Sequence, residues 1–464
     1  MSLSPAQIDA ALAYADAHVD DSLERLRALV AIKSVSTDPA YADECRRAAD
    51  WLVAELAAEG FTAAARPTPG HPVVVAEAPK VAGPTALFYA HYDVQPVDPV
   101  ALWSTDPFTL TPVVQPDGET HLVGRGTSDD KGQLLTFVEA CRALRATAGG
   151  LPINVKLCLE GEEESGSTNL AAFLTAAKPE LQADIALVCD TDLLNPTTPS
   201  ITTMLRGLVG EEVEITAADM DLHSGMFGNA ARNPNQVLAE IIASLRNPDG
   251  SVAIAGFYDD VAELDAITRE SWAKLGFDGD AYLRGVGLSL PAGEQGRSVL
   301  EQTTSRPTCE INGMIGGYTG EGFKTVIPAK ASAKISFRLV ANMDPDKVRE
   351  AFRAHVRARV PADCKVSFRA HGGSRAISVP TDGIHLQRAR DALTAEWGNE
   401  AALRGSGGSI PVAGDFKRIL GLDTLLIGYA LSDDRIHSPN EKYNLTSFRK
   451  GIRSWIRILA ALAA

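Results

Sequence analysis

The sequence of 464 residues contains no apolar run that reaches the roughly 18 residues needed to span a membrane. Its first 21 residues also lack the basic start and the continuous apolar stretch of a signal peptide, so we expect none. None of the six cysteines forms a CxxC pair, and most lie in apolar runs such as KLCLEG and ALVCDT. Buried, reduced thiols are typical of such positions. We therefore expect a cytoplasmic protein without a disulfide framework.

Acidic residues outnumber basic residues. The chain has 44 Lys and Arg and 59 Asp and Glu, which gives a net charge of -15. This charge repels phosphate backbones, so nucleic acid is not an expected partner. An anionic substrate remains compatible with it, since bound metal can reverse the field inside one cleft. Hydrophobic residues make up 45% of the chain, which is enough for a sizeable core, and the length predicts two or three domains.

Helix and strand patterns alternate over the first 200 residues. The apolar stretches TALFYAHYDV, INVKLCLEG and ADIALVCDT favour buried strands, and amphipathic helical segments separate them. This order predicts an α/β fold with a mostly parallel sheet covered by helices on both faces. The middle of the chain has the sequence pattern of an inserted α+β domain. We expect a discontinuous catalytic domain of residues 1–206 and 381–464, and an inserted lid or dimerisation domain of residues 207–380.

Histidines and carboxylates follow several of these predicted strands. The candidate positions are His91 with Asp93, Asp129 with Asp130, the run 162–164 of three glutamates, Asp190 and His437. Alone, each has an ordinary explanation, such as a surface loop, a helix cap or a solvated acidic turn. Together they fit two divalent ions that share one carboxylate, because the carboxyl ends of strands in an open α/β sheet form sites. The mixed nitrogen and oxygen donors suit Zn²⁺, with Mn²⁺ or Co²⁺ as alternatives.

Ten sequence blocks between His91 and Lys442 resemble those of a known enzyme family. In order they are HYDVQP, GRGTSDDKG, EGEEESGS, LVCDT, LRG, DLHSG, KTVIP, RLV, GGSIPV and HSPNEK. The chain is similar to the di-zinc metallopeptidase and amidohydrolase family of carnosine dipeptidase, acetylornithine deacetylase, succinyl-diaminopimelate desuccinylase and carboxypeptidase G. Three of the blocks, KTVIP, GGSIPV and HSPNEK, are most similar to the cytosolic dipeptidase branch.

The resemblance implies a role for each matching residue. Two Zn²⁺ ions would be bound by His91, Asp129, Glu164, Asp190 and His437. Asp129 would bridge the two ions and precede a cis peptide bond, Asp93 would orient His91, and Glu163 would be the general base. Asp192 could replace Asp190, although an ungapped count back from the LRG block favours Asp190. His223 would act in the partner's active site of a homodimer. Substrate would be bound by Thr325, Arg338 and Ser409, with Arg338 on the terminal carboxylate.

These residues predict a metal-dependent exopeptidase that acts on dipeptides or short peptides with a free C-terminal carboxylate. A water that bridges two metals has its pKa lowered towards neutrality, and Glu163 would take its proton and pass it to the leaving amine. An N-acyl-amino-acid deacylase, of the desuccinylase or deacetylase type, would use the same core and stays an alternative. A non-catalytic binding protein on this scaffold is a more remote one, which a metal assay would test.

Overall fold

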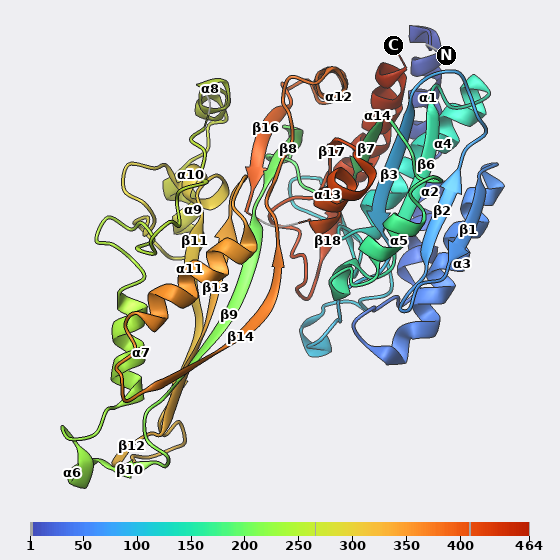
Figure 1. The fold of residues 1–464 in the computed structure, drawn as a ribbon. Helices are drawn as coiled ribbons and strands as arrows, with labels where there is room; N and C mark the ends of the chain where they lie inside the picture. The colour runs from blue at the N-terminus through green and yellow to red at the C-terminus, as the bar shows by residue number, and fades with distance from the viewer. Residues whose placement is uncertain (1–2, 265, 408–409, 464) are drawn as a thin grey trace. The chain divides into compact units, whose positions relative to one another are not determined.

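A computed structural model describes residues 3–264, 266–407 and 410–463. The chain forms two compact units, which Figure 1 shows as ribbons. The first unit contains Met1–Thr203, Val379–Arg404 and Val412–Ala464, and the second contains Met204–Ser378 and Gly405–Pro411. The chain therefore leaves the first unit to build the second, returns, and contributes one more short segment, Gly405–Pro411, to the second unit before it ends in the first. A role for the second unit as a lid or dimerisation domain stays a prediction.

A nine-stranded sheet has the order β1-β2-β6-β3-β7-β17-β8-β15, and β16 pairs with β8. Its strands are β1 (Thr62–Arg66), β2 (Val73–Glu77), β3 (Thr85–His91), β6 (Asn154–Glu160), β7 (Ile185–Val188), β8 (Ser200–Leu205), β15 (Ile377–Ser378), β16 (Ala402–Ser406) and β17 (Thr424–Leu426). The four central strands, β6, β3, β7 and β17, run parallel. Antiparallel pairs flank them on either side. The predicted α/β class is confirmed, with the parallel pairing at the centre of the sheet.

Both faces of this sheet are covered. Neighbouring side chains on a strand point to opposite faces, so adjacent residues of β3 contact different layers. Phe88 of β3 stacks on Phe137 of helix α4 (Lys131–Ala148) and meets Trp455 of helix α14 (Leu445–Leu462) edge-on. The next residue, Tyr89, packs on the other side against Phe416 of η4. The helices of this unit are α1 (Pro5–Ala17), α2 (Val19–Val30), α3 (Ala42–Ala58), α4 (Lys131–Ala148), α5 (Leu170–Ala176), α12 (Ile384–Trp397), α13 (Pro411–Asp415) and α14 (Leu445–Leu462). Shorter turns are η1 (Pro39–Tyr41), η2 (Val100–Leu102), η3 (Glu163–Ser165) and the π-helix η4 (Phe416–Leu420).

A three-stranded antiparallel sheet of order β18-β5-β4 completes the first unit. Its strands are β4 (Thr111–Val114), β5 (Thr120–Val123) and β18 (Lys442–Asn444). Lys442 lies opposite Val123 in the β5–β18 pair. This pairing brings the loop before β18 next to the loop after β5, although about 300 residues of chain separate them. Both loops carry predicted metal ligands.

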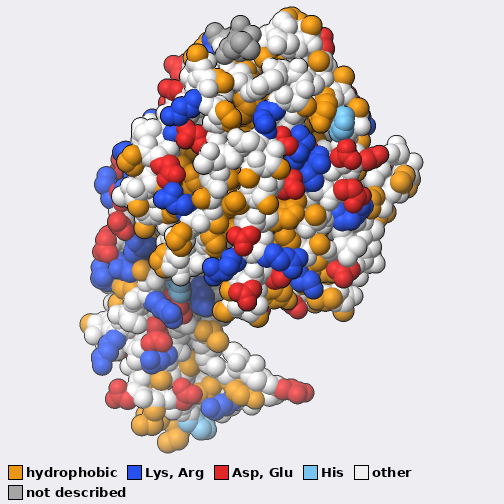
Figure 2. All heavy atoms as spheres, turned by 90° about the vertical axis from the view of Figure 1, so that its right-hand side faces the viewer, with side chains coloured by type: hydrophobic (Ala, Val, Ile, Leu, Met, Phe, Trp, Pro, Cys, Tyr) orange, Lys and Arg blue, Asp and Glu red, His pale blue; other side chains and the backbone are white. Residues whose placement is uncertain are grey.

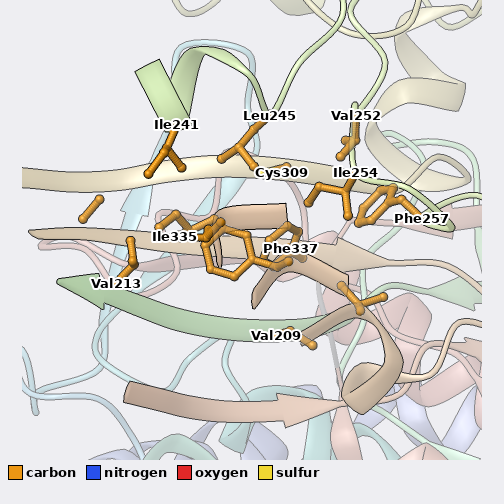
Figure 3. Close-up of a cluster of buried hydrophobic side chains, with 14 of the residues drawn as sticks. Val209, Val213, Ile241, Leu245, Val252, Ile254, Phe257, Cys309, Ile335 and Phe337 are labelled. Atoms are coloured by element: carbon orange, nitrogen blue, oxygen red, sulfur yellow. The ribbon is translucent and has the colours of Figure 1, made fainter. Parts of the chain in front are cut away.

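The second unit is built on a four-stranded antiparallel sheet of order β11-β13-β9-β14. Its strands are β9 (Gly207–Thr216), β11 (Thr308–Gly316), β13 (Lys330–Leu339) and β14 (Lys365–Ser374), with a separate ribbon of β10 (Leu222–His223) and β12 (Val326–Ile327). The helices are α6 (Ser224–Phe227), α7 (Pro234–Ala243), α8 (Ala266–Lys274), α9 (Gly279–Arg284), α10 (Val299–Thr304) and α11 (Pro345–Arg357). Alternate residues of β9 and β13 are buried and form a hydrophobic core with α7 and α11 (Figure 3).

Acidic and basic side chains are interspersed over the face of the molecule that Figure 2 presents. The net charge of -15 is therefore not gathered into one acidic patch on this face. All six cysteines are free thiols, and five of them are buried. Among the helices of the described residues, none combines the length and the apolar character needed to cross a bilayer.

Candidate metal centre

Two of the predicted ligands, His91 and Asp190, lie at the carboxyl ends of central strands. His91 is the last residue of β3 and lies opposite Glu160, the last residue of β6, in the parallel pair. Asp190 comes two residues after the end of β7, which pairs with β3 on its other side. Because these strands are parallel, their polar ends meet at one edge of the sheet. The apolar strands thus hold a histidine and a carboxylate at a single place.

Asp129 connects the two histidines of the centre. Its Oδ1 lies 3.0 Å from His91 Nε2, and its Oδ2 lies 3.0 Å from His437 Nε2. Two groups of residues offer ligand atoms within 4.8 Å of one another, and each is suited to one metal ion. They are His91 with Asp129 and Asp190, and Asp129 with Glu164 and His437. Asp129 belongs to both, and the peptide bond that follows it is cis.

The electrostatics of this cluster favour cations. Burial would raise the pKa of Asp129, but hydrogen bonds with His437 and His91 outweigh burial and lower it. Hydrogen bonds to Asp129 and Glu164 raise the pKa of His437 to about 10. Burial raises the pKa of Asp190 well above its usual value, and no described residue donates a hydrogen bond to this carboxylate. Divalent ions would neutralise the buried carboxylates, so the donor set fits metal in place of protons.

Asp93 contacts both His91 and the turn that contains Glu163 and Glu164. Its carboxylate accepts hydrogen bonds from the backbone N–H groups of Glu163 and Glu164, at 3.3 and 3.0 Å. Asp93 Oδ1 also lies 3.4 Å from His91 Nδ1. The Glu164 carboxylate accepts a further bond from Gln95 at 2.7 Å and lies 3.1 Å from His437. Glu163 belongs to neither ligand group. Burial, followed by the charge of Glu164 among other neighbours, raises the pKa of Glu163 to about 7.

Asp190 and Asp192 have different surroundings. Asp190 belongs to a ligand group, whereas Asp192 forms an ion pair with Arg404 at 3.1 Å. The backbone carbonyl of Asp192 accepts a hydrogen bond from Ser200. The arginine already neutralises the Asp192 carboxylate, so the geometry favours Asp190 as the ligand.

Glu441 is a buried residue that the sequence analysis does not identify as part of the site. Its Oε1 accepts hydrogen bonds from the backbone N–H groups of Ser128 and Asp129, at 3.0 and 3.1 Å. Its Oε2 forms a buried ion pair with Arg125 at 2.6 Å. Arg125 also donates to the carbonyl of Ser438, beside His437, at 3.4 Å. The only signal in the sequence is that Glu441 is the acidic residue of the HSPNEK block, and local pattern does not reveal its partners.

Three further predicted residues, His223, Thr325 and Arg338, lie in the second unit. His223 is exposed at the end of β10, where its Nδ1 accepts a hydrogen bond from the backbone N–H of Gly225. Thr325 is exposed beside it, since its carbonyl accepts a bond from the N–H of Ser224 at 3.1 Å. Arg338 is half-buried in β13 and lines a cavity. Ser409 lies outside the described residues.

Comparison with known proteins identifies the family. A model of peptidase family M20/M25/M40 matches residues 87–461. The chain is 32% identical to the Cys-Gly metallodipeptidase dug1 of Schizosaccharomyces pombe, over 97% of each chain. It is 29% identical to the beta-Ala-His dipeptidase of Homo sapiens, over 99% of this chain and 93% of the relative. The chain belongs to peptidase family M20/M25/M40, which confirms the predicted resemblance.

Solved structures agree with this assignment. Human carnosine dipeptidase 1 superposes with a TM-score of 0.82 and 28% identity, over 99% of this chain and 100% of that one. The M20 family metallo-carboxypeptidase Sso-CP2 from Sulfolobus solfataricus has a TM-score of 0.82 and 32% identity, over 95% and 99% of the two chains. The protein is therefore a metallopeptidase that uses divalent metal.

Proposed function

We propose that this protein hydrolyses the peptide bond of dipeptides that carry a free C-terminal carboxylate. Two Zn²⁺ ions would be held by His91, Asp129, Glu164, Asp190 and His437. The observation that carries the proposal is that Asp129 is shared by two ligand groups, because one bridging carboxylate can hold two ions side by side. The names of the relatives, which include Cys-Gly and beta-Ala-His dipeptidases, support dipeptides as substrates.

In the proposed reaction, Glu163 is the general base. When bound, the metal ions polarise the substrate carbonyl and lower the pKa of a coordinated water towards 7. Glu163 lies beside the ligand Glu164, and Asp93 holds the backbone of both residues. A pKa raised to about 7 suits a group that must accept a proton near neutral pH and release it again. Glu163 would take the proton of the attacking water and deliver it to the leaving amine.

The second unit would supply the substrate-binding groups. Arg338 would bind the terminal carboxylate, because a guanidinium offers two parallel N–H donors to a carboxylate. Thr325 and Ser409 would contact the substrate, and His223 would stabilise the oxyanion in the partner's site of a homodimer. Support for a dimer comes from β11, the edge strand of its sheet. This strand exposes apolar side chains, namely Ile311, Met314 and Ile315, and such an edge is a template for pairing with another chain.

The six free cysteines support a reducing compartment, so we place the enzyme in the cytoplasm.

A substrate panel tests the function. Unblocked dipeptides are compared with N-acetyl and N-succinyl amino acids, using protein stripped by a chelator and then reloaded with Zn²⁺ or Mn²⁺. We expect hydrolysis of dipeptides only after reloading, with about two metal ions per chain by mass spectrometry. If the N-acyl amino acids are hydrolysed in preference to the dipeptides, the protein is a deacylase and the peptidase proposal is wrong. An inactive protein that binds no metal would contradict both.

A further inference from the structure

A cavity of about 460 Å³ in the second unit has an unusual concentration of arginine. Four arginines and two glutamates line it, namely Arg206, Arg246, Arg306, Arg338, Glu294 and Glu310. Two of the arginines are already paired. Arg246 lies 3.4 Å from Glu310 and Arg306 lies 2.8 Å from Glu294. Arg206 and Arg338 form no ion pair within the described part of the chain, so the lining carries two positive charges without an ion-pair partner of their own.

Strand geometry places Arg338 on the cavity side of β13. Ile335 and Phe337 point into the hydrophobic core, as Figure 3 shows. Ser336 and Arg338 alternate with them and so point to the opposite side, where both line the cavity. The Arg338 guanidinium is therefore excluded from the core and available to a ligand.

Arg206 lies immediately before β9, the strand that pairs with β13. Its Nε donates a hydrogen bond to the carbonyl of Gly407 at 3.3 Å. A Cβ at Gly407 would lie 2.8 Å from Arg206 Nη2, so the missing side chain leaves room for the guanidinium. Burial, and next the charge of Arg338, lower the pKa of Arg206 to about 10. Arg206 and Arg338 line the same cavity from neighbouring strands, so their like charges repel each other, and an anion between them would relieve this repulsion.

We propose that Arg206 is a second substrate-binding residue, which holds the terminal carboxylate of the substrate together with Arg338. A carboxylate has two oxygens and about four lone-pair sites, so it can accept hydrogen bonds from two arginines at once. This inference rests on the proposed exopeptidase function, in which Arg338 binds that carboxylate. It adds a residue of the LRG block to the substrate site.

The test compares the metal-loaded wild type with Arg206→Met, using Ala-Gln and Ala-Glu as substrates. Ala-Gln amide, which lacks the terminal carboxylate, is measured as a competitive inhibitor, so that its affinity is known whether or not it is cleaved. We expect Arg206→Met to raise KM about 10- to 100-fold for both dipeptides, with kcat changed less than about threefold. The inhibition constant of the amide should stay within about threefold. Arg206→Lys, which keeps the charge without the planar fork, should recover part of the loss.

Two further variants serve as a reference and a control. Arg338→Met serves as the reference for loss of carboxylate binding. Lys334→Met removes a positive charge from an exposed position of the same strand and should leave KM unchanged. Equal losses for the amide and the dipeptides, or no loss at all, would overturn the inference. A loss confined to Ala-Glu would also overturn it, because Arg206 would then bind a side-chain acid. If the wild type cleaves neither dipeptide, the proposed function fails as well.

Discussion

At the scale of single residues, the turn at Glu163 and Glu164 gives two identical side chains different surroundings. Glu164 contacts His437 and belongs to a ligand group, whereas Glu163 belongs to none. Asp93 accepts hydrogen bonds from the backbone N–H groups of both residues. Asp93 therefore fixes the backbone of the turn, which would leave the Glu164 side chain for metal and the Glu163 side chain for proton transfer, as we propose.

The variant Glu163→Gln tests this separation. The amide has the size of the carboxylate but cannot take a proton, so we expect kcat to fall by at least about 10³-fold. Metal content should stay near that of the wild type, because no ligand is changed. Kinetics and metal analysis on the same preparation measure both quantities. Loss of metal in proportion to loss of activity would mean that Glu163 is a ligand and that the two roles are exchanged.

The choice between Asp190 and Asp192 shows the limit of sequence reasoning at this scale. Two acids that follow one strand are equivalent by composition and by burial pattern. What separates them is the ion pair of Asp192 with Arg404, more than 200 residues further along the chain. An ungapped count from the LRG block favoured Asp190, and the structure brings Asp190 into a ligand group. Its role as a metal ligand stays a prediction.

At the scale of elements, strand β6 ends on a buried acid outside the ligand groups. Glu160 is 1% exposed, and its Oε2 accepts a hydrogen bond from Tyr89 at 2.5 Å. Burial is the main cause that raises the pKa of Glu160 to about 8, against 4.5 in the unfolded chain. The native state therefore retains a proton that the unfolded chain releases between these values. Glu160 thus favours folding at low pH and loses this effect as pH rises.

Glu160→Gln should make this effect visible. Between about pH 4.5 and 8, the titration of Glu160 lowers the free energy of unfolding of the wild type by up to about 1.4 kcal/mol per pH unit. The glutamine has no such titration, so the stability of the variant relative to the wild type should increase with pH in this range. Urea unfolding of metal-free protein at pH 5.5, 6.5 and 7.5 measures the difference. A constant difference would show that Glu160 is ionised in the native state.

Two loops carry the predicted ligands Asp129 and His437, and the Arg125–Glu441 ion pair joins these loops. Glu441 accepts hydrogen bonds from the backbone at Asp129, and Arg125 contacts the loop of His437. His437 has a φ of 63°, in the left-handed region that non-glycine residues seldom adopt. Pairing of β5 with β18 brings these loops together. The ion pair thus holds together the two loops that carry the predicted ligands Asp129 and His437.

We expect Glu441→Gln to weaken metal binding by about 10- to 100-fold, which is typical when a residue that supports metal ligands is lost. The amide oxygen can still accept from the backbone, but Arg125 loses its counter-charge. Competition with a chelator of known affinity measures the effect without any assay of activity. Glu139→Gln is the matched control, because Glu139 forms a largely buried ion pair with Arg25 at 2.6 Å, away from the ligands. Equal weakening in both variants would indicate general destabilisation.

The elements themselves were largely predictable, and the contacts between distant loops were not. Apolar runs before His91 and Asp190 identified β3 and β7, because a buried parallel strand is apolar on both faces. The three-stranded sheet of β4, β5 and β18 had no such signal, since its strands are only three or four residues long. Its pairing joins segments some 300 residues apart, so neither the Arg125–Glu441 pair nor its contacts could be read from local pattern.

At the scale of the whole molecule, the predicted active-site residues are divided between the two units. The metal ligands and Glu163 belong to the first unit, whereas His223, Thr325 and Arg338 belong to the second. His223 is exposed in the β10–β12 ribbon, and β11 presents an apolar edge in the same unit. A two-fold interface through this unit would let each chain lend its histidine to the other, so that a site needs both chains.

Mixing two inactive variants tests whether the sites are shared. Homodimers of His223→Ala and of Glu163→Gln should each be nearly inactive. In a mixed dimer, one site has both defects, and the other combines intact Glu163 from one chain with intact His223 from its partner. Random reassortment of equal amounts makes about half of the dimers mixed, so roughly a quarter of all sites should recover. Activity after mild dissociation and reassociation, with subunit exchange verified by native mass spectrometry, measures this recovery. If exchange is complete and no activity returns, His223 acts within its own chain or has no catalytic part, and the shared site is wrong.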